Sequence, residues 1–101
     1  MDACVPAPLR RLLSGHEVKT AQDMGWSALA NGELLRAVEA EFEVFITADK
    51  NLRYQQNLAD RTLAIIVLPT NDWSVLKRMA GEVSSALSLI RAGELIELAA
   101  P

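Results

Sequence analysis

The sequence predicts a single α/β domain, residues 1–101, built on a mostly parallel sheet. Two patterns support this fold class. Apolar segments of strand length alternate with amphipathic segments of helix length, as the crossover connections between parallel strands require. The run Leu63–Leu68 is wholly apolar, which is typical of a strand covered on both faces.

The first third of the chain predicts a short helix, a short strand and a loop. A helix over Pro6–Leu13 opens with two prolines, whose missing N–H groups cost nothing in a first turn, and Gly15 ends it. His16–Ala21 alternates apolar and polar residues, which favours a strand. Asp23–Asn31 follows as a loop.

The middle of the chain predicts a helix and then a strand. Asn31 is a good N-cap, and the apolar residues after it fall near one helical face: Leu34, Leu35, Val38 and Phe42. Phe42–Thr47 is a β-rich run, followed by a turn over Ala48–Asn51. Tyr54–Ala59 is long enough for one or two helical turns.

The last third predicts a strand, a long helix and a second strand. Pro69 closes the strand Leu63–Leu68. The helix begins at a cap, Asn71 or Asp72, and Gly93 marks its end. Glu94–Leu98 is the final strand. The apolar stripe of the helix steps by three and four residues: Trp73, Leu76, Ala80, Val83, Leu87 and Ile90.

Charge, cysteine content and hydropathy narrow the class of protein. The net charge is −3 and the pI is about 5.0, which argues against a broad basic face for nucleic acid but not against a local acidic metal pocket. A single cysteine, Cys4, cannot form an internal disulfide and fits a reducing compartment. No apolar run approaches the ~20 residues that cross a bilayer, and no signal peptide is visible. We therefore expect a cytoplasmic protein without a membrane partner.

Three carboxylates fall near positions where a parallel sheet binds ligands. Asp49 follows the strand Phe42–Thr47, Glu33 lies in the first turn of the preceding helix, and Asp2 precedes the first helix. Ligands bind at the carboxyl ends of such strands. Gathered there, the three side chains would hold Mg²⁺ or Mn²⁺, which prefer oxygen ligands. A cation held this way lowers the pKa of a bound water and offsets charge on a phosphodiester.

Each carboxylate also fits an ordinary structural role. Glu33 can stabilise a helix N-terminus, Asp49 can belong to an Asp-Lys-Asn turn, and Asp2 lies near a chain end. Other residues have similar alternatives. His16 fits a strand edge, Cys4 a small buried apolar side chain, and Trp26 and Trp73 core or cover positions.

Polar residues after Asp49 are candidates for contact with a phosphate backbone, although such residues are more often solvated. They are Lys50, Asn51 and Arg53, with Arg61 further along.

Several short motifs, in this order, resemble short bacterial PIN-like proteins, the toxin-like relatives of VapC ribonucleases. They are Asp2-Ala3-Cys4-Val5-Pro6, Leu9-Arg10-Arg11-Leu12-Leu13, Gly15-His16-Glu17-Val18, Met24-Gly25-Trp26, Asn31-Gly32-Glu33-Leu34-Leu35, Thr47-Ala48-Asp49-Lys50-Asn51-Leu52 and Gln55-Gln56-Asn57-Leu58. The resemblance runs from Asp2 to about Leu68 and is looser beyond.

The resemblance implies a three-layer α/β/α sandwich and cleavage of RNA that depends on Mg²⁺ or Mn²⁺. By position, Asp2, Glu33 and Asp49 fall on the family's acidic sites. The sequence departs from the family at its start. Members usually begin with an apolar strand that ends in an Asp-Glu pair and lies inside the sheet, whereas here Met1 stands directly before Asp2 and Ala3 replaces the Glu.

The absent strand leaves two hypotheses of function open. One is a metal-dependent endoribonuclease of the toxin type, weak or inactive in this form. The other is a non-catalytic PIN-like interaction module that pairs with itself or with an antitoxin. A small-ligand-binding α/β domain is a third hypothesis, for which no Gly-rich phosphate loop is present. Because unpaired backbone groups inside a sheet are costly, we also expect a homodimer.

Overall fold

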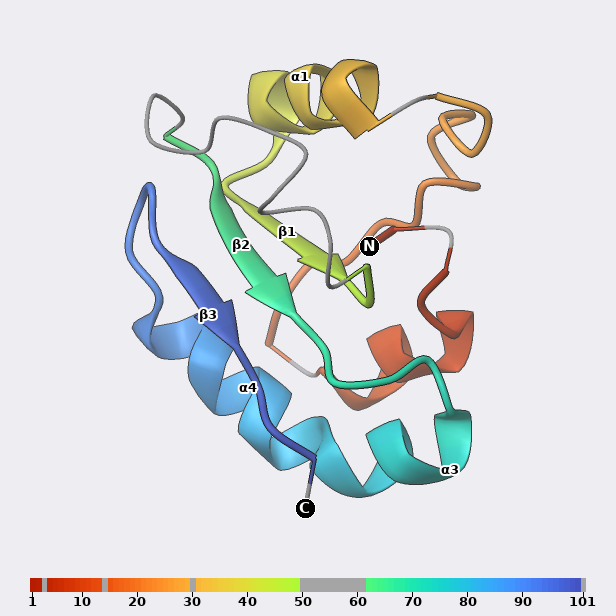
Figure 1. The fold of residues 1–101 in the computed structure, drawn as a ribbon, viewed down its shortest axis with the longest axis vertical. Coiled ribbons are helices and arrows are strands. Elements are labelled where there is room, and N and C mark those ends of the chain that lie inside the picture. Colours follow the sequence, from red (N-terminus) through yellow and green to blue (C-terminus); the bar gives the residue numbers. More distant parts are fainter. Residues whose placement is uncertain (3, 14, 30, 50–61, 101) are drawn as a thin grey trace.

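Three parallel strands form the centre of the molecule, as the sequence predicts (Figure 1). The computed structural model describes residues 1–2, 4–13, 15–29, 31–49 and 62–100. The strand order is β1-β2-β3, with β1 at Val44–Thr47, β2 at Ala64–Val67 and β3 at Leu95–Glu97. The α/β class and the parallel sheet are therefore confirmed.

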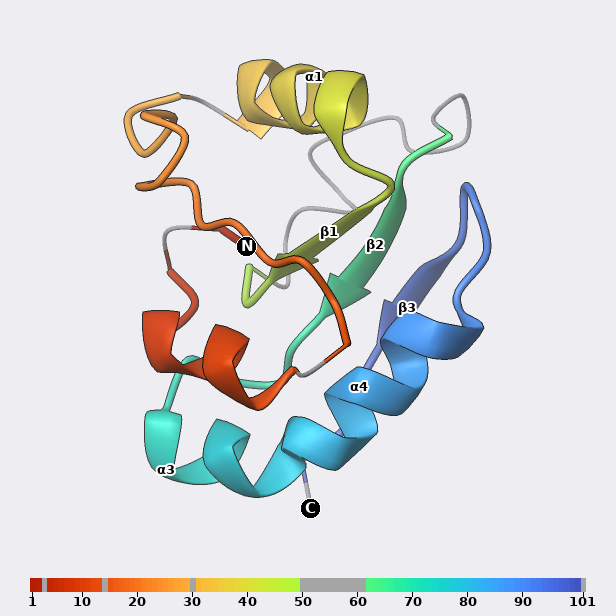
Figure 2. The same cartoon turned by 180° about the vertical axis from the view of Figure 1, so that it is seen from behind.

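Helices pack against both faces of this sheet (Figures 1 and 2). On one face lies α1, Asn31–Glu41. On the other lie the 3₁₀ helix η1 (Ala7–Leu12) and a stretch made of α3 (Trp73–Leu76), η2 (Lys77–Met79) and α4 (Ala80–Leu89). All four residues of β2 are buried, which is the prediction made from its apolar run.

The core divides into two clusters because successive side chains of a strand point to opposite faces. The cluster under α1 contains Leu34, Leu35, Val38, Phe45, Leu63, Ile65 and Val67. The opposite cluster contains Val5, Leu9, Leu13, Ile46, Ile66, Leu68, Leu76, Met79, Val83 and Ala86. The sheet is thus apolar on both sides, and its strands are held by packing as well as by their ladder.

The predicted long helix is interrupted. Asp72 caps its start as expected, accepting a hydrogen bond of 2.9 Å from the Ser74 amide. A 3₁₀ turn then separates α3 from α4, and Gly81, a poor helix former, follows this break. The helix ends at Leu89 rather than at Gly93. With its φ of +79°, Gly93 serves the turn before β3 instead.

Two predictions near the N-terminus have different outcomes. The first short helix is present as η1, with Pro6 at its N-cap. The predicted strand His16–Ala21 is wrong, because residues 16–21 join no sheet. A continuous ladder needs a neighbouring strand, and among the described residues Met1 alone bonds to this segment in the manner of one. The predicted turn Ala48–Asn51 lies partly, and Tyr54–Ala59 wholly, outside the described residues.

None of the helices in the described part of the chain is long and apolar enough to span a membrane.

The packing of the α3–α4 stretch can be tested by truncating one buried and one exposed leucine. Leu76 is fully buried, whereas Leu89 is 75% exposed. Leu76→Ala should lower the free energy of unfolding by about 2–5 kcal/mol because it leaves a cavity, while Leu89→Ala should change it by less than about 0.5 kcal/mol. Urea unfolding followed by circular dichroism measures both variants. Equal losses would contradict the packing described here.

Candidate functional site

The Thr47 hydroxyl joins Asp2 to Asp49 at the carboxyl end of β1. Thr47 is the last residue of β1 and is fully buried. Its hydroxyl donates to Asp2 Oδ2 at 2.7 Å and accepts from the Asp49 amide at 3.0 Å. Since ligands of parallel sheets bind at the carboxyl ends of the strands, this is the candidate site.

Backbone hydrogen bonds place Asp2 beside β1. Its amide donates to the Ile46 carbonyl at 2.8 Å, and its carbonyl accepts from the Val5 amide at 3.1 Å. A residue so close to a chain end often frays, but here both of its backbone polar groups are used. No local pattern in the sequence predicts the bond to Ile46, so only the family resemblance placed Asp2 near the sheet.

Cys4 lies beside the same hydroxyl. Its Sγ is 3.8 Å from Thr47 Oγ1. Partial removal from water raises the pKa of this thiol, and the nearby Asp2 carboxylate adds to the rise, outweighing the Ala48 amide that lowers it. The thiol is thus held in its neutral form, and carboxylate and hydroxyl oxygens dominate the donor set. Cys4 is exposed, so its expected role as a buried apolar side chain is wrong.

The other predicted site residues are not joined to this cluster. Glu33 is exposed in the first turn of α1, and none of the described hydrogen bonds or ion pairs involves it. Within the described ranges, no group of three or more His, Cys, Asp or Glu side chains is placed to hold a metal ion. Lys50, Asn51 and Arg53 lie outside the described residues.

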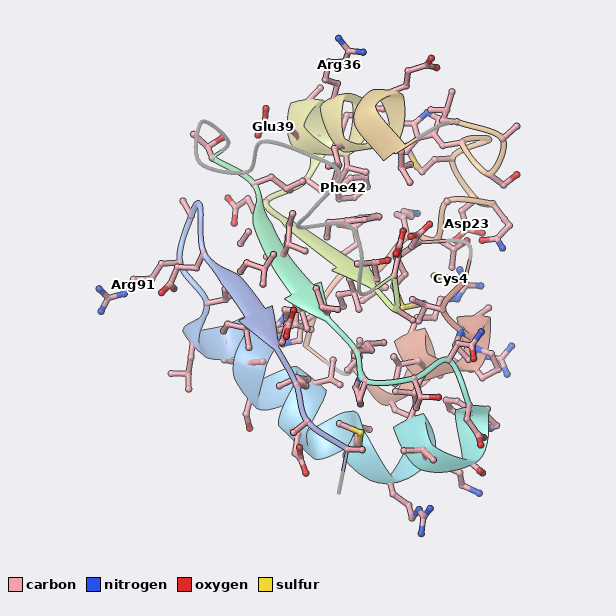
Figure 3. The ribbon with its side chains drawn as sticks, in the orientation of Figure 1. Cys4, Asp23, Arg36, Glu39, Phe42 and Arg91 are labelled. Carbon is pink, nitrogen blue, oxygen red and sulfur yellow. The ribbon has the colours of Figure 1, made fainter. Side chains whose placement is uncertain are left out.

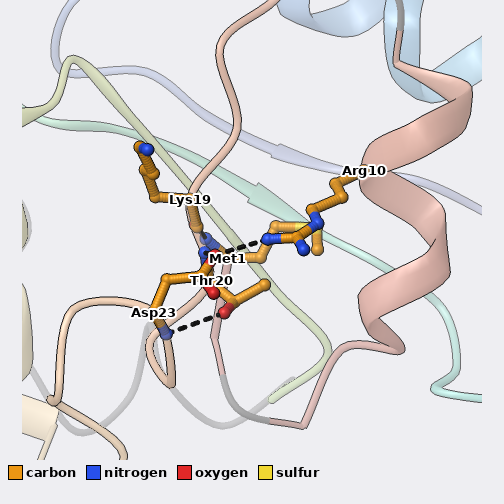
Figure 4. A network of polar contacts seen from close by, with 5 residues as sticks. All are labelled: Met1, Arg10, Lys19, Thr20 and Asp23. Atoms are coloured by element: carbon orange, nitrogen blue, oxygen red, sulfur yellow. Dashed lines mark hydrogen bonds and ion pairs between the residues drawn. The ribbon is translucent and has the colours of Figure 1, made fainter.

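A polar network that the sequence analysis missed fixes the turn next to Met1 (Figure 4). Thr20 and Asp23 bond reciprocally: the Thr20 amide donates to Asp23 Oδ2 and the Asp23 amide donates to Thr20 Oγ1, both at 3.0 Å. Arg10 pairs with the same carboxylate. The Thr-x-x-Asp spacing, which resembles a capping box, was the signal in the sequence.

Electrostatics support this network. The Thr20 amide, with smaller contributions from the Thr20 hydroxyl and Arg10, lowers the pKa of the Asp23 carboxyl. Burial lowers the pKa of the Met1 amino group, against the opposing effect of Asp2 and Asp23. The Met1 amino group donates to the Lys19 carbonyl at 2.6 Å. Figure 3 shows Cys4 and Asp23 in the same part of the molecule, beyond the end of β1.

A cavity of about 460 Å³ lies between β1 and the segment of residues 16–21. Its volume falls in the range of ligand pockets, about 300–1,000 Å³. Leu34 and Val38 of α1 line one side, together with Trp26 from the segment before the helix, whose ring meets Phe42 edge-on with the ring centroids 6.4 Å apart. Leu87 of α4 lies on the lining too.

Trp26 and Trp73 pack against one core cluster each and cover it, as expected.

Comparisons with family models, curated proteins and solved structures find no match to this chain.

The role of Thr47 is testable with two substitutions. Thr47→Val removes the hydroxyl and with it the hydrogen bonds to the Asp2 carboxylate and from the Asp49 amide, so the free energy of unfolding should fall by about 1–3 kcal/mol. Thr47→Ser keeps the hydroxyl and should retain both hydrogen bonds, so its free energy of unfolding should stay close to that of the wild type. A Thr47→Val protein as stable as wild type would contradict the network.

The Asp23 network predicts a pH dependence. Because the folded pKa of Asp23 lies below its ordinary value of 3.8, its contribution to stability is present above that pH and is lost as the pH falls through the folded pKa. Asp23→Asn should therefore be less stable than wild type at pH 6, and the difference should shrink at pH 2–3. A difference in unfolding free energy that is constant with pH would show that the charge is irrelevant.

Proposed function

We propose that the protein is a metal-dependent endoribonuclease of the PIN-like toxin type, with its site at the carboxyl end of β1. The observation that supports this most is that the Asp2 carboxylate and the Asp49 backbone amide meet at one buried hydroxyl, although the two residues lie 47 positions apart in sequence. We interpret the sheet with helices on both faces as the corresponding three-layer sandwich.

Carboxylates are the side chains that suit a hard divalent cation. The Asp2 and Asp49 carboxylates would hold Mg²⁺ or Mn²⁺, and Glu33, in the first turn of α1, is a further proposed ligand. Carboxylate oxygens are the ligands such cations prefer, and the neutral Cys4 thiol would compete poorly for them. When bound, the cation supplies a bound water of lowered pKa and offsets charge on the phosphodiester.

The protein's own residues have distinct roles in this proposal. Thr47 orients the Asp2 carboxylate through its 2.7 Å hydrogen bond and ties Asp49 to the end of the strand. Asp2 in turn depends on its backbone bond to Ile46 for its position. The proposed RNA contacts are Lys50, Asn51 and Arg53, which follow Asp49 in the sequence.

A second candidate function is a non-catalytic interaction module that binds an antitoxin or a second copy. The cavity beside β1 favours it, because a large apolar-lined opening next to a sheet edge is a feature of polypeptide binding.

Asp49→Asn separates the two functions. It keeps the side-chain shape and removes the charge a cation needs, so both Mn²⁺ binding, measured by water-proton relaxation, and cleavage of a mixed-sequence RNA should be lost. Asp72→Asn is the matched control, because Asn also caps a helix and Asp72 lies at the start of α3.

The outcome with chelator is equally decisive. EDTA should abolish cleavage by the wild-type protein. Cleavage that persists in EDTA, or that survives Asp49→Asn, would contradict the proposed site. A folded protein that neither binds Mn²⁺ nor cleaves RNA would favour the interaction module.

A further inference from the structure

The open edge of β1 carries backbone groups that no described strand pairs. The Ala64 amide donates to the Glu43 carbonyl and the Leu68 amide to the Thr47 carbonyl, so the odd-numbered residues of this segment face β2. Because backbone groups alternate along a strand, Val44 and Ile46 face away from β2. The Ile46 carbonyl is met by the Asp2 amide, while no hydrogen bond among the described residues reaches the amides of Val44 and Ile46 or the carbonyl of Val44.

Met1 and Asp2 occupy one end of the space between residues 16–21 and β1, which we call the lane. The Met1 nitrogen donates to the Lys19 carbonyl and the Met1 carbonyl accepts from the Ala21 amide at 2.8 Å, so Met1 bonds to the residues on either side of Thr20. This is the hydrogen-bond pattern of parallel strands. With Asp2 bonded to β1 on its other side, the two walls stand two strand spacings apart there, about 9–10 Å.

Beyond Met1, the cavity occupies the rest of the lane. Residues 16–21 form one wall and residues 43–46 form the other, so both walls continue past the point where Met1 bridges them. Apolar side chains lie on both sides of the lane, with Leu34, Val38 and Phe42 toward α1 and Leu87 toward α4. A strand placed here would therefore need apolar residues on both of its faces.

The contacts of Met1 indicate that the occupant runs parallel to β1, and the charges of the lining indicate which residue precedes its apolar run. Three exposed carboxylates, Glu17, Glu41 and Glu43, lie on the lining where β1 begins, whereas the one lysine of the described lining, Lys19, is bonded to Met1 at the other end. A strand parallel to β1 has its N-terminal end there, and its C-terminal end approaches Met1. A basic residue just before the apolar run would meet the carboxylates.

We propose that this lane, defined as the slot between residues 16–21 and β1, binds an extended apolar segment of a partner protein as an added parallel strand. The segment has about four consecutive apolar residues, is preceded by Lys or Arg, and ends or turns away at Met1. Added strands of this kind gain affinity from main-chain hydrogen bonds and specificity from side-chain pockets.

The edge strand of a second copy fits the slot poorly. Among the described strands the other open edge is that of β3, and Glu94 and Glu97 flank its apolar residues. In either orientation one of these carboxylates would face the acidic end of the slot, which like-charge repulsion disfavours. A partner strand with a basic flank is therefore the better match.

A fluorescein-labelled peptide, Lys-Val-Ile-Val-Val, tests the proposal by fluorescence anisotropy with the 101-residue protein. We expect saturable binding, and no binding of the control peptide Lys-Val-Pro-Val-Val, whose proline removes a donor. Val44→Pro should abolish binding, because it removes a slot-facing amide and leaves the bonds to β2 intact.

A charge exchange keeps the test decisive if Val44→Pro fails to fold. Glu43→Lys should weaken binding of the Lys peptide by about threefold to fivefold and strengthen that of Glu-Val-Ile-Val-Val, while Glu82→Lys on α4 should change neither. Absence of saturable binding, or binding insensitive to both slot variants, would overturn the proposal.

Two further outcomes would replace the partner strand with another occupant. Sedimentation equilibrium that shows a dimer, together with peptide binding that weakens as the protein concentration rises, would assign the slot to a second copy. Stabilisation by the same five residues fused directly before Met1, with no binding of the free peptide, would assign it to a strand continuous with the chain. Either result overturns binding of a partner in trans, and neither depends on RNA cleavage.

Discussion

The hydrogen bonds of Met1 and Asp2 fix the segment of residues 19–21 beside the sheet. These two residues bridge β1 and the segment of residues 19–21, with bonds of 2.6–2.8 Å to both. Without the bridge, residues 16–21 would have no described backbone link to the sheet, and Asp2 would not stand beside Thr47. One short contact thus sets both the proposed cation site and the slot next to it.

The two features share one support. A metal ligand needs a rigid setting, and the bonds of Asp2 to Ile46 and Thr47 tie it to β1. The reciprocal Thr20–Asp23 bonds and the Arg10 pair hold the other side of the bridge. A strand bound in the slot would hydrogen-bond to the backbone groups of residues 16–21 and of β1 that lie next to Met1. Asp2 would then be held more rigidly. Partner binding and catalysis would then be coupled, since the same bridge serves both.

Patterns with a strong local cause were predictable from the sequence. The apolar run of β2, the amphipathic α1 and the Asp72 cap each follow from side-chain period or capping chemistry, and the parallel sheet follows from their alternation. The break at Lys77–Met79 was not predictable, because the apolar stripe continues through it. The strand expected at residues 16–21 failed because a strand also needs a partner, which a local pattern does not report.

The site was predictable only in part, for a similar reason. The position of Asp49 after a strand is readable from the sequence, but the convergence of Asp2 on Thr47 depends on contacts 45 residues apart. Glu33 lies in the first turn of α1, and no described hydrogen bond or ion pair joins it to Asp2 or Asp49. The Thr-x-x-Asp signal at Thr20 was present in the sequence and was overlooked because the segment reads as a strand.

An unfilled strand position beside β1 can be detected by hydrogen exchange of the free protein. Residue-resolved amide exchange by NMR compares neighbours within one strand. We predict fast exchange at Val44 and Ile46, which face the slot, and slow exchange at Phe45 and Thr47, which face β2. Equally slow exchange at all four amides in the dilute protein would show that the edge is already paired and that no strand position is unfilled.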